Sequence, residues 1–397
     1  MALKTRACLS RIATALQKND GCGFSSPRKF TSTSVNECNN NLSKNRRSLL
    51  ANAKISRPNA AQILPQRNYL AAVVSNVRDP IEIQEQKREL KPKDRELLVQ
   101  VDSAGVNSSD VQMIRGEYFH EPKTPFVPGY EFAGEVLEVG AKVDEFKKGD
   151  RVLGVKKHTQ GAFAERCVLH VNSAHRIPHS LPYDMAASLP VAYGAAYLAL
   201  AKIGQVQTDQ FVLVLSSQGA TGLACVDMAV NVFKCRVIAA AENEQKCAMV
   251  RPMGVLSTVE YTDENLPKIV SKMTNGHGCD LVIDTVGGYW FDLAMRCIKP
   301  GGRLVTTGCS SGKVPLLKLS DLLTNSVSVC GARLSSLAEE NPDEFHEIID
   351  RLIDWREQGY LMEVRPKQFA LADINDAIRY METQPQPFAK VVLVCRQ

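Results

Sequence analysis

The feature that most constrains the fold is residues 211–224, FVLVLSSQGATGLA, where five apolar residues run into a turn of small residues. The apolar run indicates a buried parallel strand, and the small residues predict a turn into a helix. Gly219 and Gly222 lack a side chain, so a phosphate can approach the backbone, and helix N–H groups attract anions. Ser217 replaces the first glycine of the G-x-G-x-x-G dinucleotide fingerprint. The loop alone is therefore equally consistent with an ordinary strand–turn–helix connection.

The residues after this turn repeat the alternation of strand and helix. Strands are predicted at residues 236–241, 258–261, 280–286, 303–308 and 326–332, and helices near 222–231, up to Met253, at 266–273 and at 289–297. Six strands alternating with helices is typical of a doubly wound sheet, which binds ligands at the carboxyl ends of its strands. The alternation makes the turn a candidate cofactor site.

The preceding residues predict a different kind of domain. Short alternating strands are expected at residues 69–75, 96–106, 131–140, 150–155 and 163–170, separated by Gly and Pro turns. This pattern favours an antiparallel, partly open barrel. A helical stretch at 183–204 follows it, stopped at Gly204.

The C-terminal part predicts two helices and two strands. The helices are expected at 345–359 and 374–383, and the strands near Val364 and at 389–395. The last strand has no partner of its own kind nearby, so we expect it to return to the first domain.

Composition is informative mainly at the amino terminus. The 397-residue chain has a net charge of +5, but residues 1–67 hold twelve Lys or Arg against Asp20 and Glu37. The remainder is mildly acidic, so no nucleic-acid partner is indicated. An Arg- and Ser-rich, acid-poor leader with an amphipathic start predicts a transit peptide and a mitochondrial matrix location. A disordered tail without function is the alternative.

Cysteine spacing and apolar runs exclude other classes. The twelve cysteines include no C-x-x-C pair, and those beyond the leader are at least ten residues apart. This spacing predicts free thiols in a reducing compartment rather than a disulfide framework or a zinc knot. No apolar run approaches the ~18 residues of a membrane span, so no integral membrane segment is expected.

Blocks of sequence along residues 69–397 carry a family resemblance. They include AGVNSSD (104–110), PFVPGYEFAGEVLEVG (125–140), FKKGDRV (146–152), GAFAE (161–165), LPVAYGAAYLAL (189–200), AAAENEQK (239–246), DTVGG (284–288), KPGGRLVTTG (299–308) and KVVL (390–393). In this order they resemble the medium-chain dehydrogenase/reductase superfamily, in its zinc-free quinone oxidoreductase branch that includes ζ-crystallin.

The resemblance implies an α/β chain with a GroES-like, partly open β-barrel domain and a doubly wound Rossmann cofactor domain. The expected divisions are a leader at 1–67, the GroES-like domain at 68–192, the Rossmann domain at 193–332 and a return to the GroES-like domain at 333–397.

The resemblance also implies a catalytic pair, Asn107 and Tyr118, which would polarise a carbonyl by hydrogen bonds. In the zinc-dependent alcohol dehydrogenases a Cys and a His bind the metal, and Asn107 and Tyr130 match those positions here. Because neither is a good zinc ligand, no metal site is expected. Asp110 is a weaker candidate, and Gln112 stands where many relatives carry a second tyrosine. Alternatively, Asn107 and Asp110 only form a turn and Tyr118 only packs on a loop.

The cofactor is expected to be NADPH, with NADH left possible. The matching cofactor-binding residues are Tyr193, Gly219, Ala220, Thr221, Gly222, Leu223, Asn243, Lys246, Tyr261, Val286, Gly308 and Lys390. Lys246 and Tyr261 match contacts to a 2′-phosphate, whereas Glu242, twenty residues past Gly222, favours the ribose of NADH. Ser217 and Gln218 are expected to place side chains beside the pyrophosphate.

We therefore expect a zinc-independent oxidoreductase that transfers hydride from NADPH to a quinone or related enone. The resemblance implies a homodimer paired through the edge strand near residues 326–331. Two alternatives stay open: a mitochondrial enoyl-thioester reductase, and an NADPH-binding regulatory or interaction protein with little turnover.

Overall fold

A computed structural model describes residues 68–87, 89–118, 123–156, 161–261, 264–383 and 389–396. The predicted transit peptide lies outside these residues. Pro65–Gln397 forms one compact unit. Within the described ranges, no helix is both long and apolar enough to cross a membrane.

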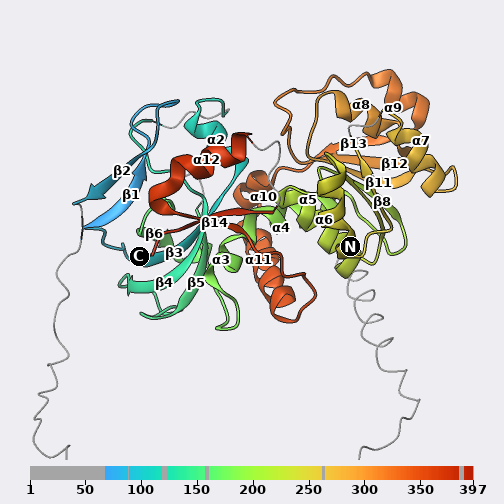
Figure 1. The fold of residues 1–397 in the computed structure, drawn as a ribbon. Coiled ribbons are helices and arrows are strands. Elements are labelled where there is room, and N and C mark those ends of the chain that lie inside the picture. Colours follow the sequence, from blue (N-terminus) through green and yellow to red (C-terminus); the bar gives the residue numbers. More distant parts are fainter. Residues whose placement is uncertain are drawn as a thin grey trace, which may run out of the picture. The chain divides into compact units, whose positions relative to one another are not determined.

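The first sheet is organised around its longest strand, β3 (Glu96–Val106) (Figure 1). The sheet has the order β14-β15-β3-β4-β5-β7, with β6 also paired to β3. Its other strands are β4 (Glu131–Val139), β5 (Arg151–Val155), β6 (Arg166–His170), β7 (Ala174–Arg176), β14 (Lys367–Ala370) and β15 (Val391–Val394). Along one edge of β3, β6 pairs with the first half and β15 with the second half, both antiparallel.

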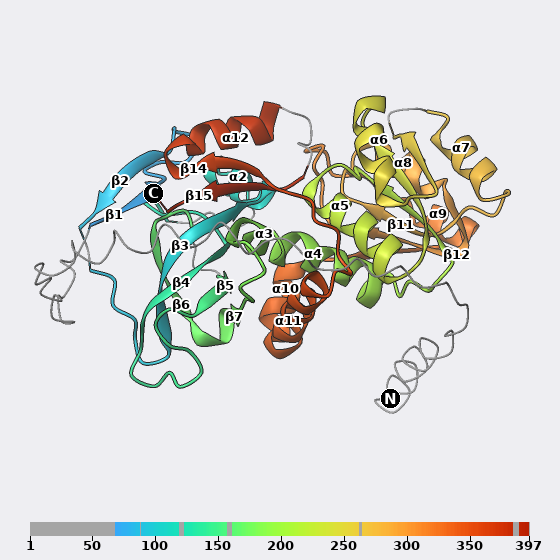
Figure 2. The same cartoon turned by 60° about the horizontal axis from the view of Figure 1, so that its bottom comes forward.

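The pairing of β15 with β3 confirms that the last strand returns to the first domain (Figure 2). This domain has its own core, in which Leu97, Phe132 and Phe163 are fully buried. A separate hairpin of β1 (Tyr69–Val73) and β2 (Glu82–Gln86) joins the barrel through a bridge between Ala71 and Ala164. The helix α2 (Ser108–Ile114) was not predicted from the sequence.

The second sheet is parallel throughout, with the order β10-β9-β8-β11-β12-β13. Its strands are β8 (Phe211–Leu215), β9 (Arg236–Ala241), β10 (Ser257–Glu260), β11 (Cys279–Asp284), β12 (Ile298–Thr306) and β13 (Ser328–Gly331). The helices that alternate with these strands are α5 (Ala220–Asp227), α6 (Glu244–Val250), α7 (Leu266–Met273), α8 (Tyr289–Met295) and α9 (Leu319–Asn325). The predicted doubly wound fold is confirmed, and its strand order reverses between β8 and β11.

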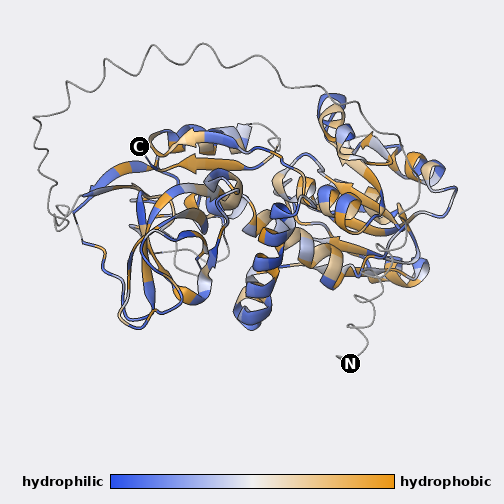
Figure 3. Cartoon of the chain, turned by 90° about the horizontal axis from the view of Figure 1, so that it is seen from below, coloured by the Kyte–Doolittle hydropathy of each residue, from blue (hydrophilic) through white to orange (hydrophobic). Residues whose placement is uncertain are grey.

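Hydropathy explains the two sheets. Figure 3 shows hydrophobic colouring along the strands and more hydrophilic colouring on several helices, as expected for helices that expose one face. In the parallel sheet, Val212, Leu213, Val214 and Leu215 are all fully buried. This is why their run in the sequence shows no alternation.

The remaining helices are α3 (Tyr183–Ala187), α4 (Pro190–Tyr197), α10 (Leu334–Glu340), α11 (Pro342–Glu357) and α12 (Ile374–Thr383). The helix predicted over 183–204 is interrupted at Ser188 and Leu189, because Pro190 has no N–H and starts a new helix. Beyond α4, a wider-wound segment (Leu198–Ile203) continues to Gly204. The strand expected near Val364 is wrong: the strand starts at Lys367, after Pro366.

Candidate active site

Residues 216–219, called the nucleotide turn below, connect β8 to α5 at the point where the strand order reverses. Gly219 is the N-cap residue of α5. The N–H groups of Ala220, Thr221, Gly222 and Leu223 form the first helical turn, where intrahelical acceptors are mostly missing. A Cβ at Gly222 would lie 2.0 Å from the carbonyl oxygen of Ser216. Gly222 therefore lets the helix start pack against the end of the strand, and the turn has the form of an anion site.

Ser217 and Gln218 do not place their side chains beside the pyrophosphate position, so that expectation is wrong. Both residues are completely buried. The Ser217 hydroxyl donates to the carbonyl oxygen of Ala240 over 3.1 Å, on the neighbouring strand, and Gln218 forms a hydrogen bond with Tyr261. The loss of the first glycine therefore adds no bulk to the exposed surface of the turn.

The residues that were predicted to select the cofactor follow β9, lie in α6 and follow β10. Glu242 forms an ion pair with Lys246, one turn along α6, and both side chains are largely buried. The Asn243 side chain caps α6 by accepting the N–H of Lys246 at 3.0 Å. Tyr261 is 4% exposed, and burial raises the pKa of its phenol to about 12. The ammonium group of Lys246, which was predicted to contact a 2′-phosphate, is thus already faced by a carboxylate.

Val286 and Gly308 lie just beyond β11 and β12, at the carboxyl edge of the sheet. The Val286 side chain is buried, and its carbonyl oxygen accepts the N–H of Ser311 at 3.0 Å. Gly308 is exposed, with ordinary space around its α-carbon. Both positions are at the edge where parallel sheets bind ligands, with backbone rather than side chain available at Gly308.

Tyr193 lies on α4 with its hydroxyl directed at Asp227 of α5. It donates a hydrogen bond of 2.7 Å to the buried Asp227 carboxylate, which also accepts from Asn231 and from the Met362 N–H. Burial raises the pKa of Asp227. In this structure Tyr193 joins helices α4 and α5. Its hydroxyl therefore has a packing role that does not require a cofactor.

The predicted catalytic residue Asn107 lies in a buried polar network. Its Oδ1 accepts from the Lys390 ammonium at 2.5 Å, and its Nδ2 donates to Glu131 Oε1 at 3.0 Å. Lys390 and Glu131 form an ion pair at 2.5 Å, with side chains 7% and 0% exposed. Because Lys only donates and a carboxylate only accepts, these two partners set the orientation of the amide.

Space for this network depends on a glycine in β3. A Cβ at Gly105 would lie 2.6 Å from Glu131 Oε1. The second carboxylate oxygen of Glu131 accepts the Val191 N–H at 2.8 Å. The Glu131 carboxylate therefore packs against Gly105 of β3 and contacts the start of α4. It also contacts the side chains of Asn107 and Lys390.

Asp110 lies in the same buried region, at the start of α2. Its Oδ2 accepts the backbone N–H of Asn107 at 2.8 Å and closes a capping box. Burial is the main reason that the pKa of Asp110 is raised to about 7, and the nearby Lys390 partly opposes that rise. Asp110 can therefore hold a proton near neutral pH.

Two tyrosines lie near this carboxyl group. Tyr118 is partly exposed, and its pKa is raised mainly by burial and further by Asp110. The Tyr130 hydroxyl is 3.8 Å from Met113 Sδ, and burial and Asp110 raise its pKa as well. Both phenols stay protonated at neutral pH, and Tyr118 can act as a hydrogen-bond donor.

The network and the nucleotide turn are neighbours. The backbone N–H of Ala389 donates to the carbonyl oxygen of Gln218 at 3.1 Å, and Ala389 bridges to Gly219. Lys390, the next residue, contacts Asn107. The structure therefore brings Asn107, Lys390 and the turn at Gly219 into one site, while their individual roles stay predictions.

Glu131 was not predicted to belong to the site, and Asp110 was given only a weak role. The sequence contained a signal for Glu131: it stands at the start of an apolar strand, as Lys390 stands before the apolar run VVLV. Opposite charges at the ends of two buried strands need each other as partners.

Comparison with known proteins agrees with this architecture. Residues 93–179 match the model of the alcohol dehydrogenase GroES-like domain, and residues 220–354 match that of the zinc-binding dehydrogenase domain. The quinone oxidoreductase-like protein 2 homolog of Nematostella vectensis is 34% identical over 333 residues, covering 84% of this chain and 90% of the relative. The chain belongs to the medium-chain dehydrogenase/reductase superfamily.

Solved structures of this superfamily have the same fold. A quinone oxidoreductase from Pseudomonas syringae is 26% identical, with a TM-score of 0.75 over 82% of this chain and 99% of that one. A mycobacterial protein complexed with NADPH is 25% identical, with a TM-score of 0.75 over 82% and 99% of the two chains. Family membership and fold therefore place this chain among the medium-chain oxidoreductases.

Proposed function

We propose that this protein reduces a conjugated carbonyl compound, a quinone or an enone, with NADPH and without a catalytic metal. The observation that carries the proposal is the buried contact of Asn107 with both Lys390 and Glu131, next to the nucleotide turn. Asn107 occupies the position where zinc-dependent relatives have a cysteine ligand. An amide polarised by an ammonium ion replaces the metal ligand there.

The donor atoms at this position do not suit a cation. The Asn107 carbonyl oxygen faces an ammonium group at 2.5 Å, which repels a positive ion. Burial raises the pKa of Tyr130, so its phenol stays neutral and is a poor ligand for zinc. Because no metal ion would be bound here, hydrogen-bond donors would polarise the substrate oxygen.

The chain offers two such donors. One hydrogen of Asn107 Nδ2 is used by Glu131, and the second is available for a substrate oxygen. The Lys390 contact at Oδ1 withdraws electron density from the amide and strengthens this donor. The Tyr118 hydroxyl stays protonated at neutral pH because burial raises its pKa, so it can donate a hydrogen bond to the substrate oxygen. It can then pass its proton to the basic oxyanion that hydride transfer leaves on that oxygen. When bound, NADPH supplies the hydride, so hydride and proton together complete the reduction.

Hydrogen bonds alone suit acceptors that are already electron-poor. A quinone or enone takes hydride at conjugated carbon and needs only modest stabilisation of the oxyanion that forms. A simple ketone demands more polarisation. The expected order of rates is therefore quinones and enones first, with saturated ketones far below.

The test is a substrate panel with the purified, chelator-treated protein and NADPH. A small quinone, an open-chain enone, a 2-enoyl thioester and a saturated ketone are compared by the loss of NADPH absorbance. Fast oxidation with quinone or enone supports the proposal. A reaction confined to the enoyl thioester favours the second enzyme class, and tight NADPH binding without turnover favours a regulatory protein.

The preference for NADPH over NADH rests on Lys246 beside the expected 2′-phosphate. Because Glu242 is paired with Lys246, its carboxylate opposes a phosphate at that position. We expect Glu242→Gln to lower KM for NADPH about tenfold, equal to about 1.4 kcal/mol, with little change for NADH. The matched variant Lys246→Gln should raise KM for NADPH only. A wild-type protein that prefers NADH strongly would contradict the choice of cofactor.

We also propose that the protein is a homodimer paired through β13. Among the described strands, β13 has a neighbour on one side only, β12. The segment before it exposes large apolar side chains: Val314, Leu316, Leu319 and Leu323 are 82%, 90%, 78% and 83% exposed. An open strand edge beside an apolar surface is suited to pairing with a second copy.

The mitochondrial matrix is the proposed location, on the composition of residues 1–67. The cationic, acid-poor leader supports it. Fusing residues 1–67 to a fluorescent protein tests it: matrix import supports the proposal, and a diffuse cytosolic signal contradicts it.

A further inference from the structure

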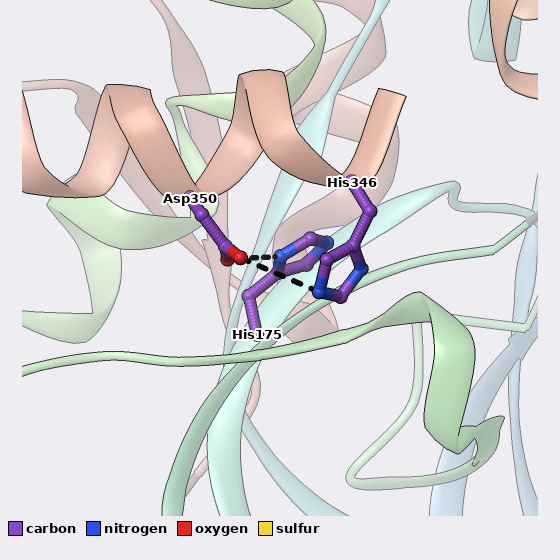
Figure 4. Close-up of side chains that lie close together, drawn as sticks. All are labelled: His175, His346 and Asp350. Atoms are coloured by element: carbon purple, nitrogen blue, oxygen red, sulfur yellow. Dashed lines mark hydrogen bonds and ion pairs between the residues drawn. The ribbon is translucent and has the colours of Figure 1, made fainter. Parts of the chain in front are cut away.

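A second group of titratable side chains lies where β7 meets α11, elements that carry none of the candidate catalytic or cofactor residues. His175 stands on β7, and His346 and Asp350 stand one turn apart on α11 (Figure 4). Their ligand atoms all lie within 4.8 Å of one another. We propose that these three residues bind a divalent transition metal ion, with Zn²⁺ as the best match.

The backbone holds the three side chains together across a long separation in sequence. His175 pairs with Leu153 of β5, so its strand position is set by the barrel. Residues four apart on a helix share one face, so His346 and Asp350 both point to His175. The helix packs through its buried residues Phe345 and Ile349, which leaves the His346 and Asp350 face for the strand.

The donor set suits zinc. Two imidazoles and one carboxylate form a three-ligand site with an open position for water. Zinc bonds of about 2.0–2.2 Å in a tetrahedron separate ligand atoms by roughly 3.3 Å. His346 Nε2 lies 3.4 Å from Asp350 Oδ2, which matches. His175 Nδ1 lies 2.7 Å from Asp350 Oδ1, so this contact must open slightly.

The rings can make this adjustment. The imidazoles of His175 and His346 stack with centroids 4.1 Å apart and planes inclined by 28°. The His346 side chain is 37% exposed and that of Asp350 is 52% exposed, whereas that of His175 is 1% exposed. Both exposed side chains can turn toward an ion while the buried ring keeps its place.

The hydrogen bonds of His175 leave its ring free to change tautomer, because among the described residues only Nδ1 is engaged, in the contact with Asp350. Its Nε2 has no hydrogen-bond partner within the described part of the chain, so Asp350 alone selects the present tautomer. An ion that replaces the contact with Asp350 binds the Nδ1 lone pair, and the ring proton then resides on Nε2.

The surroundings admit and attract a cation. The cluster borders a cavity of about 950 Å³ that is also lined by Asp343, Glu347 and Asp354. The cationic side chain at its wall, Arg176, is paired with Asp150 at 3.3 Å. A cavity lined by carboxylates raises the local concentration of a divalent cation.

The test titrates Zn²⁺ into the metal-stripped full chain by calorimetry. The variants His346→Gln and Asp350→Asn each remove one exposed ligand without touching the core. His277→Gln is the matched control, because His277 is an exposed histidine far along the chain from the cluster. We expect one Zn²⁺ per chain, unchanged in the control. Loss of a residue that only supports a metal ligand lowers metal affinity by roughly 10–100-fold. Because His346 and Asp350 would bind the ion directly, either ligand variant should lower Zn²⁺ affinity by more than that.

A second readout separates this site from the free cysteines. Co²⁺ bound by imidazole and carboxylate gives visible absorption without the near-ultraviolet charge-transfer band of a thiolate, and the ligand variants should lose it. If the wild-type chain binds no more Zn²⁺ than His346→Gln at saturating metal, or if Co²⁺ shows the thiolate band, the proposal is overturned. Neither result depends on reductase activity.

Discussion

The backbone N–H of Ala389 donates to the carbonyl oxygen of Gln218 over 3.1 Å. This bond ties the approach to the last strand of the first sheet to the nucleotide turn of the second. It places Lys390, which holds Asn107 and Glu131, one residue from that contact. The segment of residues 389–390 therefore positions both the nucleotide turn and the buried network of Asn107, Lys390 and Glu131.

Lys390→Met tests the buried ion pair. Its loss leaves Glu131 charged and enclosed without its cation, so we expect the free energy of unfolding to fall by about 3–5 kcal/mol. Denaturant unfolding measures this change. Lys148→Met, at an exposed lysine, should change it by less than about 0.5 kcal/mol. Adding Glu131→Gln to Lys390→Met should restore much of the loss, and a double variant as unstable as the single one would contradict the pairing argument.

Gly222→Ala tests the close packing of the nucleotide turn. The new Cβ would lie 2.0 Å from the Ser216 carbonyl oxygen, so α5 must move away from the strand end. We expect at least a tenfold weaker Kd for NADPH, equal to about 1.4 kcal/mol, by calorimetry. Gly331→Ala is the control, because within one chain no described residue other than its sequence neighbours comes within 4 Å of its Cβ position. Unchanged NADPH affinity in Gly222→Ala would contradict the proposed anion site.

Asp110 predicts a particular dependence of stability on pH. Its folded pKa of about 7 lies above the ordinary value of 3.8, so the folded state holds this proton more tightly than the unfolded state. Its contribution is complete below about pH 4 and is lost as the pH rises through about 7.

Asp110→Asn mimics the protonated form and should remove that dependence. Relative to wild type, we expect the variant to gain roughly 1–3 kcal/mol between about pH 5 and about pH 8 in denaturant unfolding. Comparing variant with wild type cancels the titration of other groups. An equal stability difference at both pH values would show that Asp110 is ionised throughout.

Much of this fold could be predicted because its strands have distinct patterns. The buried parallel strand at Phe211–Leu215 and the alternation after it led to the doubly wound sheet. The break before Pro190 was not predicted, because the residues around this single proline are strongly helix-forming. The short helix α2 has only seven residues and depends on the Asn107 cap and tertiary contacts, so periodicity could not reveal it.

The site was less predictable for a different reason. Asn107 and Lys390 are 283 residues apart, and their contact follows from the pairing of β15 with β3. Glu131 completes that contact, and its place at the start of an apolar strand signals a buried charge without saying which residue pairs with it. The direction of the Ser217 and Gln218 side chains depends on the neighbouring strand, which the loop sequence does not encode.

The proposed dimer makes a further prediction. Leu319→Asp with Leu323→Asp places charges on the exposed apolar surface beside β13, where neither side chain is buried within the chain. We expect the protein to become monomeric in light scattering, with its thermal unfolding little changed. Lys318→Asp, at an exposed neighbour, should remain dimeric. A wild-type monomer would contradict the proposed pairing.

The most direct test of the central claim is kcat/KM for NADPH-dependent reduction of a small quinone by the metal-stripped protein and by Asn107→Ala. If hydrogen bonds polarise the substrate, stripping leaves the wild-type value unchanged. Removing the Asn107 amide then lowers kcat/KM by about 10²–10³-fold. Activity that disappears on stripping and returns with Zn²⁺, or an Asn107→Ala variant as active as wild type, would contradict the account.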